Sequence, residues 1–579
     1  MNSRAKRFKI GDENVVRGLL EESESDLSSF SEFDDTDEDD TYMPPNSSGD
    51  NQSFNDSSDI DENTLEVVNN HPKTSKQTWN DITNQNQKNF LFEKNPGLKI
   101  EIPHNATIWT YLNLFITDEI INLMVVETNK NADQVLSKHR LTKASRFSKW
   151  VPTNDVEIKQ FLGLLMWMGL VQMPSLKDYW SVKMLYKNCV AKNIMSRNRF
   201  ELILRFWHFA DNDQAPESDR IFKIRNLITK MVHNFQNIME PEEMMAVDET
   251  MVPFRGRLKF KQYIPGKAHK YGIKLFKLCG VNGYTYNMEV YAGKSQTDGR
   301  GLGCRVVVDL SSRYLNCGRT IITDNFYTSL NLANELLEKN THLIGTLRSN
   351  RVKLPDVTKA KLQPGQIVGK ENSNGIVVAK WRDKRDVTML STRHDISMID
   401  TGKKNRKNES IVKPKIIIDY NAGKAGIDLS DQLSSYSSPV RKSIRWYHKV
   451  ATEVLLGTAV VNALIVYNLN TPQNKLKITQ FRELLINEML GFIGFNQSEQ
   501  DQTSLVLPKT RRAKHVFIQT TLKCNRNRKL RKRCAHCYNE KTTTVGSVQA
   551  CKDVKRVTTL CETCDVYTCA DCFIKHHTK

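Results

Sequence analysis

The 579-residue sequence lacks an apolar run long enough to cross a bilayer. Its longest apolar runs, at 161–173 and 454–467, fall short of the roughly 18–20 residues that a membrane-spanning helix needs. We interpret both runs as buried helices. Residues 1–16 also lack the apolar core of a secretory signal, so a reducing compartment, the nucleus or the cytosol, is expected.

Two segments each lack charge of one sign. Residues 21–40 contain eleven acids and no base, whereas residues 509–533 contain eleven bases and no acid. Over the whole chain, 84 Lys and Arg oppose 65 Asp and Glu, so the net charge is +19 and the pI about 9.2. This balance favours a polyanionic partner, nucleic acid before an anionic membrane, although a merely basic soluble protein would have the same composition.

The chain is too long for one core, and its composition divides it. Residues 1–105 are rich in Asp, Glu, Ser and Asn and poor in periodic apolar residues, so they cannot bury enough surface to offset their ordering entropy. We predict that they are disordered. From 106 to 243 apolar residues recur at spacings of three and four, which predicts helices, with Thr153 or Asn154 as the N-cap of one of them.

Short apolar runs between turn residues follow from 244 to 352 and predict a mixed α/β sheet. Strands are expected at 244–254, 270–280, 286–293, 304–310, 319–326 and 342–348, with a helix at 331–340. Residues 353–413 hold further strand-like runs and are interpreted as a β-rich insertion. The sheet domain resumes at 414–435, where Gly423–Gly426 suits a tight turn and a helix is expected to begin near Asp428. Helices continue through 436–500, and a basic linker at 501–533 leads to a cysteine-rich segment at 534–579.

Two aspartates lie in or directly after apolar strand-like runs. Asp248 interrupts AVDET, and Asp324 follows IIT. A carboxylate at a buried strand is costly unless it is paired or bound to a metal. Asp428 and Asp431 lie three residues apart on the expected helix, so their carboxylates face the same side. Taken singly, each of these acids is more commonly a turn or capping residue than a catalytic one.

The segments that contain these acids also carry a family pattern. MMAVDETMVPFRGR, QYIPGKAHKYGIKLFKLC, TDNFYTSLNLANELLEKNTHLIGTLRSNR, and NAGKAGIDLSDQL with RKSIRWYHK resemble, in this order, the piggyBac transposase family. The likeness runs from about residue 107 to the C-terminus. It implies an α/β plus α fold: an RNase H-like catalytic domain with a β-rich insertion, inside a split helical domain for dimerisation and DNA binding. It also implies catalytic positions at Asp248, Asp324 and Asp428 and a further acid at Asp431.

The resemblance implies a cut-and-paste DNA transposase that acts as a homodimer in the nucleus. Transposon ends would be cut through hairpin intermediates and joined to TTAA sites, with two Mg²⁺ ions held by the three aspartates and Asp248 as the bridge. Paired ions about 3.5–4 Å apart suit this chemistry, and such hard cations prefer carboxylate ligands. The alternatives are a domesticated DNA-binding protein without mobility, or a zinc-domain module that binds chromatin or ubiquitin-pathway proteins. Neither a membrane nor a small molecule is expected as a partner.

Basic and aromatic residues accompany the acids and are expected to contact DNA. They are Lys259, Lys261, Lys270, Lys274, Arg348, Arg351, Arg441, Lys442, Arg445 and Trp446. The lysines and arginines suit phosphate contacts, although a solvated charged strand face would have the same pattern. By resemblance Trp446 lies near the DNA hairpin, where a base could stack on it, or it covers a helix-packing face.

The end of the sequence is dense in cysteine, with eight of the twelve after residue 523. Three C-x₂-C pairs, Cys534/Cys537, Cys561/Cys564 and Cys569/Cys572, predict zinc binding in a reducing compartment. The resemblance implies a cross-brace domain with two zinc ions, in which these six cysteines and His577 are ligands.

The eighth zinc ligand is open between His576 and Cys551, and Cys524 is expected to stay out. The basic run 526–533 precedes the first cysteine pair. It is interpreted as a nuclear localisation signal, or as an arm that contacts DNA phosphates.

Overall fold

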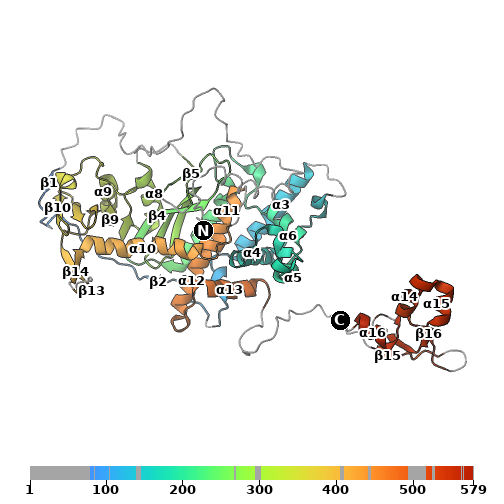
Figure 1. Ribbon diagram of the computed structural model, residues 1–579. Helices are drawn as coiled ribbons and strands as arrows, with labels where there is room; N and C mark the ends of the chain where they lie inside the picture. The colour runs from blue at the N-terminus through green and yellow to red at the C-terminus, as the bar shows by residue number, and fades with distance from the viewer. Residues whose placement is uncertain are drawn as a thin grey trace, which may run out of the picture. The chain divides into compact units, whose positions relative to one another are not determined.

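A computed structural model of the chain describes residues 78–83, 85–103, 105–138, 145–265, 269–293, 301–404, 408, 410–440, 445–492, 517–523, 528–562, 564 and 566–577. The chain divides into two compact units, Met1–Phe495 and Asn496–Lys579. The first unit holds helices and one large sheet (Figure 1).

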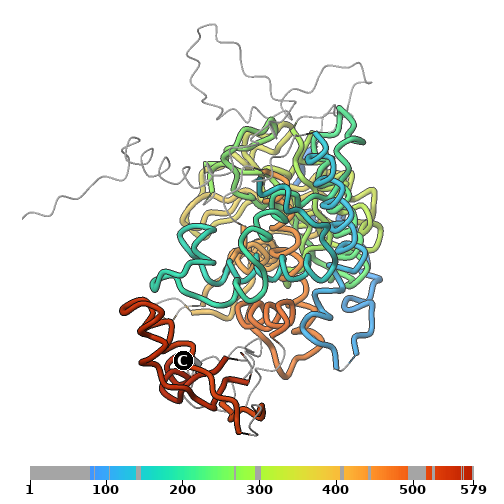
Figure 2. The backbone as a smooth tube through the Cα atoms, turned by 90° about the vertical axis from the view of Figure 1, so that its right-hand side faces the viewer, coloured from blue at the N-terminus to red at the C-terminus, as the bar shows by residue number. Residues whose placement is uncertain are grey.

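The first part of this unit is helical, as predicted. Its helices are α2 (Ile108–Asn113), α3 (Asp118–Ser137), α4 (Asp155–Leu170), α5 (Val190–Ile194), α6 (Arg197–Phe206) and α7 (Phe222–Ile238). Asn154 caps α4, because its side-chain oxygen accepts a hydrogen bond from the Glu157 N–H at 2.9 Å. Two later helices, α12 (Ala459–Asn470) and α13 (Ile478–Met489), pack on α2, and α13 also packs on α4 (Figure 2). The helical part is therefore assembled from segments far apart in the sequence.

The large sheet has the order β1-β10-β11-β12-β9-β8-β4-β6-β5, and β7 pairs with β6. Its strands are β1 (Trp79–Asn80), β4 (Met244–Pro253), β5 (Gln262–Tyr263), β6 (Tyr271–Gly280), β7 (Thr285–Val290), β8 (Thr320–Thr323), β9 (His342–Thr346), β10 (Ile367–Asn372), β11 (Val377–Arg382) and β12 (Asp386–Ser391). Strands β4, β8 and β9 run parallel, and the other pairs are antiparallel. Strands β10, β11 and β12 of the expected insertion thus extend the sheet of β4 and β8, whereas β13 (Met398–Lys404) and β14 (Ser410–Pro414) pair only with each other among the described residues.

One predicted strand is wrong, since 304–310 lies within helix α8 (Leu302–Ser311). This helix packs on β6 and β7, with Cys304, Val307 and Leu310 among its buried residues. A short run of valines does not reveal by periodicity whether it is a buried strand or a buried helix. The predicted helix at 331–340 is confirmed as α9 (Leu330–Glu338).

The predicted disorder of residues 1–105 is wrong for residues 78–103. In this stretch β1 pairs with β10, and β2 (Gly97–Leu98) pairs with β3 (Met239–Glu240). The apolar side chains that pack against the core are Trp79, Phe90, Leu98, Ile100 and Ile102. Their burial offsets the entropy lost on ordering this segment. Among them, Phe90 contacts the ring of His342. Residues 1–77 lie outside the described part of the chain.

The predicted buried helix near 454–467 is confirmed as part of a longer helical segment, Trp446–Asn470. It comprises α11 (Trp446–Thr452), a π-helical turn η8 (Glu453–Thr458) and α12. The expectation that no segment is long and apolar enough to cross a membrane is wrong for this one by length and composition, but 89% of its most apolar window is buried inside the protein. Its apolar composition is therefore explained by a position in the core.

Helix α10 (Lys415–Ser435) lies across the sheet, in contact with β4, β6, β8 and β9 (Figure 1). It continues through Gly423 and Gly426, so the predicted turn there and the helix start near Asp428 are wrong. A Cβ at Gly426 would lie 2.1 Å from the carbonyl oxygen of Gly280, and one at Gly423 would lie 1.8 Å from Cδ1 of Ile322. These glycines let the helix approach the sheet closely.

We expect Gly426→Ala to destabilise the protein by about 1–3 kcal/mol, the usual cost of overpacking a filled interior. On an exposed helix the same change would stabilise by roughly 0.8–1.0 kcal/mol. Urea unfolding measures the difference. Ala425→Gly, on the exposed face of the same helix, is the control and should lose only helix propensity. Greater stability of Gly426→Ala would contradict the close approach.

The second unit is built from short elements. Strands β15 (Phe517–Gln519), β18 (Thr559–Cys561) and β19 (Val566–Tyr567) form one sheet, and β16 (Lys532–Arg533) pairs with β17 (Arg556–Val557). Its helices are α14 (Ala535–Val545), α15 (Ser547–Asp553) and α16 (Ala570–His577). Its strands are only two or three residues long, and its helices have at most 11 residues.

Candidate active site and metal centre

The parallel pairing of β4 and β8 brings Asp248 and Asp324 together. Val247 lies opposite Thr323 in this register, so the next residues along both strands are the two aspartates. Both are half-buried. The Asp324 carboxylate accepts a hydrogen bond from the Phe326 N–H at 2.8 Å, which fixes it at the end of β8. Two acids predicted from separate runs are thus neighbours at one point of the sheet.

Asp428 lies on α10, one helical turn after Lys424, and the lysine links the three acids. Burial by itself would lower the pKa of Lys424, yet its pKa is raised by the electrostatic effects of Tyr420, Asp248, Asp428 and Asp324. All three aspartates are therefore within electrostatic reach of one cation. Their oxygens do not all lie within 4.8 Å of one another, a distance that the four cysteines described below do meet.

The donor set suits a hard divalent cation. Burial raises the pKa of Asp324, and the negative charge of Glu249 raises it further. Glu249 accepts a hydrogen bond from the Tyr327 hydroxyl at 2.9 Å, and its carboxylate lies 3.9 Å from Lys274 Nζ. Half-buried carboxylates crowded in this way repel one another, and a divalent cation bound between them would offset that repulsion.

Sequence reasoning missed Lys424, Glu249 and Tyr327. Lys424 precedes Asp428 by four residues, a spacing that places both on one helix face. This signal was hidden because the helix was expected to begin only near Asp428. Glu249 faces the opposite way from Asp248 in an ideal strand, so its contribution to the site became visible only in three dimensions.

Asp431 lies in a buried ionic network with Lys277 of β6. The Lys277 side chain is fully buried, with Nζ 3.5 Å from Asp431 Oδ1 and 3.9 Å from Glu453 Oε1. Asp431 Oδ1 also accepts a hydrogen bond from the Thr250 hydroxyl at 2.6 Å, and Glu453 accepts one from Ser434 at 2.7 Å. Burial would lower the pKa of Lys277, but the two carboxylates raise it, so the lysine is charged. Asp431 thus ties α10 to β4 and β6, and its accessory catalytic role stays a prediction.

We expect Lys277→Met to destabilise the protein by about 3–5 kcal/mol, because it leaves two carboxylates without their buried cation. Neutralising them as well, with Asp431→Asn and Glu453→Gln, should restore much of this loss. Lys339→Met, which breaks a partly exposed pair with Glu335, is the control and should cost at most about 1 kcal/mol. Urea unfolding midpoints of the variants would be compared. Equal effects of Lys277→Met and Lys339→Met would contradict the buried network.

The predicted DNA-contacting lysines differ in their surroundings. Lys259 and Lys270 are exposed. Lys261 donates a hydrogen bond to the Gly256 carbonyl at 3.0 Å, whereas Lys274 faces Glu249 and lies over the rings of Phe276 and Phe326. Exposure thus favours phosphate contacts for the first two, while Lys274 belongs to the acidic site.

Arg348 and Arg351 hold the loop that follows Asp324. Arg348 donates to the Asn325 side chain at 3.2 Å, and Arg351 donates to the carbonyls of Asn325 and Phe326 at 3.2 and 2.7 Å. Because Phe326 in turn binds the Asp324 carboxylate through its N–H, both arginines help to place that acid. Their contacts with DNA stay a prediction.

Trp446, at the start of α11, packs edge-on against Phe260 with ring centroids 5.2 Å apart. It is half-buried, so part of the ring faces solvent. Arg445 donates a hydrogen bond to the Arg205 carbonyl. The packing and stacking interpretations of Trp446 are therefore compatible. Arg441 and Lys442 lie outside the described residues.

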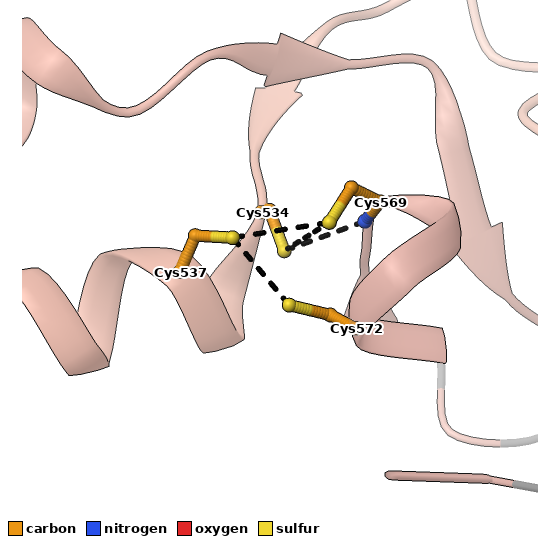
Figure 3. A group of neighbouring side chains, drawn as sticks. All are labelled: Cys534, Cys537, Cys569 and Cys572. Atoms are coloured by element: carbon orange, nitrogen blue, oxygen red, sulfur yellow. Dashed lines mark hydrogen bonds between the residues drawn. The ribbon is translucent and has the colours of Figure 1, made fainter. Parts of the chain in front are cut away.

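Four cysteines of the second unit converge on one point (Figure 3). Cys537 Sγ lies 3.8 Å from Cys569 Sγ and 3.4 Å from Cys572 Sγ, and Cys534 Sγ lies 3.8 Å from Cys569 Sγ. Four thiolates at Zn–S distances of about 2.3 Å in a tetrahedron lie about 3.8 Å apart. Although burial would raise it, hydrogen bonds from neighbouring N–H groups and thiols lower the pKa of Cys534 to about 7. The first and third C-x₂-C pairs thus form one zinc-type site.

The remaining predicted zinc ligands do not form a second group of this kind among the described residues. Desolvation raises the pKa of the Cys564 thiol most, and the neighbouring Cys561 thiol raises it further. His576 stacks on His536 at 4.1 Å between ring centroids, and the Cys551 thiol lies 3.6 Å from the Tyr538 hydroxyl. The side chain of His577 and all of Cys524 lie outside the described part of the chain.

Comparisons with known proteins agree with this arrangement. A family model described as Transposase IS4 matches residues 109–464. Human PiggyBac transposable element-derived protein 3 is 26% identical over 491 residues, covering 81% of this chain and 76% of the relative. Human PiggyBac transposable element-derived protein 2 is 27% identical over 391 residues, covering 64% of this chain and 63% of the relative.

Among solved structures, the fold is similar to that in the cryo-EM structure of a piggyBac transposase synaptic complex with hairpin DNA. The TM-score is 0.63 at 24% identity, and the match covers 83% of this chain and 100% of the other. The predicted mixed α/β architecture with a C-terminal cysteine cluster is thereby confirmed in outline.

Proposed function

Because this chain belongs to the Transposase IS4 family, in its piggyBac type, we propose that it is a metal-dependent DNA transposase. In this proposal it cleaves transposon ends through hairpin intermediates and joins them to TTAA sites, as a homodimer in the nucleus. The observation that carries the proposal is the parallel register of β4 and β8, which sets Asp248 beside Asp324. Asp428 on α10 acts electrostatically on Lys424, as these two acids do. The net charge of +19 supports a DNA partner.

In the proposed site, Asp248, Asp324 and Asp428 would hold two Mg²⁺ ions, which supply Lewis acidity for phosphodiester cleavage and strand transfer. The chain's own residues place these ligands. The Phe326 N–H orients Asp324, and the arginines at 348 and 351 hold its loop. Lys424 neutralises part of the clustered charge, so the carboxylates can stay ionised close together.

The proposal is tested with purified protein, DNA that carries the element's own ends, and Mg²⁺. Nicked and hairpin products on a denaturing gel are expected. DNA binding without any cleavage would instead support the second candidate, a sequence-specific DNA-binding protein without mobility. That candidate is favoured by the names of the human relatives, which describe transposable element-derived proteins. Absence of both DNA binding and DNA cleavage would contradict both candidates.

The charge around Asp324 predicts a pH dependence. A carboxyl group must be ionised to hold Mg²⁺, and Asp324 has its pKa raised by burial and then by Glu249, against the effect of Lys424. Activity should therefore fall on acidification at a higher pH than an ordinary aspartate would give. Glu249→Gln should move this acid limb to lower pH, and Lys424→Met to higher pH. Cleavage rates between pH 5 and 8 measure both shifts, and Asp309→Asn is the distant control. Shifts of the acid limb in the same direction for Glu249→Gln and Lys424→Met would contradict the assignment of this limb to Asp324.

A further inference from the structure

A short apolar segment stands out on the surface of the helical part. It lies between η3 (Leu176–Trp180) and α5 and includes the single turn η4 (Met184–Tyr186). Val182, Met184 and Leu185 are 83%, 88% and 89% exposed, the highest values of any large apolar residue in the described ranges. Isolated apolar residues on a surface are common, but three within four positions indicate a contact surface.

The base of this segment is held firmly. The Trp180 indole N–H donates to the Met195 carbonyl at 2.8 Å, and Lys192 Nζ donates to the Ser181 carbonyl at 2.8 Å. The neighbouring Tyr179 is buried, and its hydroxyl donates to the Met168 carbonyl at 3.2 Å. The exposed side chains are thus presented from an anchored base, which reduces the entropy lost when a partner covers them.

The positive charge around this segment favours DNA over a second copy of the chain as its partner. From 179 to 200 the chain has five bases and no acid. Two of these bases, Lys183 and Lys187, are exposed and flank Met184 and Leu185. In a symmetric contact between two copies the same patch meets itself, so these lysines would repel each other. Apolar side chains between lysines instead match duplex DNA, whose base steps accept an apolar wedge while the phosphates take the cations.

We propose that Met184 and Leu185 form a wedge that enters a base step of the duplex containing TTAA, with Lys183 and Lys187 on the flanking phosphates. The TA step in the middle of this site is a pyrimidine–purine step, which costs least to unstack and kink. The inference rests on the proposed function and adds a step of target deformation to it. It assigns the wedge to the target duplex, apart from the chemistry at the aspartates.

The full-length protein would be titrated into a TTAA duplex that carries 2-aminopurine at the TA step, without divalent metal. Unstacking should raise the probe's fluorescence, and Met184→Ser/Leu185→Ser should remove this rise and weaken binding about tenfold. Lys183→Ser/Lys187→Ser should keep the rise at saturation but reduce the dependence of log affinity on log salt by about 0.9 per lost contact. Leu91→Ser, another highly exposed apolar position, is the matched control and should change neither.

Two results would overturn the wedge. One is an unchanged fluorescence rise in Met184→Ser/Leu185→Ser. The other is a change in oligomeric state in that variant, by sedimentation, with DNA deformation intact, which would make the segment a protein interface. The proposed function is followed separately by nicking of transposon ends. Met184→Ser/Leu185→Ser should still nick transposon ends but no longer join them to TTAA. If the wild-type protein does not nick transposon ends, the proposed function is refuted, whereas the wedge is still judged by the fluorescence rise.

Discussion

We expect Asp324→Asn to abolish Mg²⁺-dependent cleavage of transposon-end DNA while DNA binding is retained. Asparagine keeps the shape of the side chain, and its amide oxygen can still accept the Phe326 N–H bond that places it at the end of β8. The substitution removes the negative charge that binds a divalent cation. The loss should exceed the roughly 10–100-fold that removal of an outer-shell partner of a metal site costs.

The measurement pairs a cleavage assay with a salt-controlled gel shift on the same DNA. Asp309→Asn, an exposed acid on α8 that pairs with Arg305, is the matched control and should leave cleavage unchanged. Asp248→Asn and Asp428→Asn should behave like Asp324→Asn if the three carboxylates form one site. Wild-type cleavage by Asp324→Asn would remove this residue from the site.

The second large effect concerns the cysteine cluster. We expect zinc chelation, or Cys569→Ser, to unfold the unit Asn496–Lys579 while leaving the first unit folded. Structural zinc contributes about 10–16 kcal/mol in small domains, as much as the whole stability of a typical domain. The unit has short strands and few buried apolar side chains to compensate for that loss.

Bound zinc would be measured by atomic absorption and local unfolding by limited proteolysis with mass spectrometry. Cleavage sites should appear after residue 516 in the chelated protein and in Cys569→Ser. Cys189→Ser, an exposed cysteine of the first unit, is the control and should keep both the zinc and the protease resistance. A Cys569→Ser protein with full zinc content would show that the four thiols are not the ligands.

The sequence by itself determined the elements whose signal is local. The strands that contain Asp248 and precede Asp324 alternate or run apolar between turn residues, and the helices of the first part repeat at three and four. Four motifs in order identified the family, and the C-x₂-C spacing indicated a zinc-type site. In each case neighbouring residues in the chain carry the information, because backbone geometry sets the periodicity.

Only the tertiary structure decided what depends on distant partners. Gly423 and Gly426 are unfavourable inside a helix taken alone, so they were predicted as a turn. In the fold, the Gly280 backbone leaves no room for a Cβ at Gly426, and the Ile322 side chain would have to move for one at Gly423. Buried charges follow the same rule. Asp431 pairs with Lys277 of β6, and Lys424 is within electrostatic reach of Asp248 and Asp324, which the sequence spacing does not encode.

The tertiary structure also decided that the first and third cysteine pairs meet at one point. Cys534 and Cys569 lie 35 residues apart in the chain and 3.8 Å apart in space. Chain spacing limits which two ligands of a pair can reach one ion, but only the folding of the intervening strands and helices selects which pairs meet.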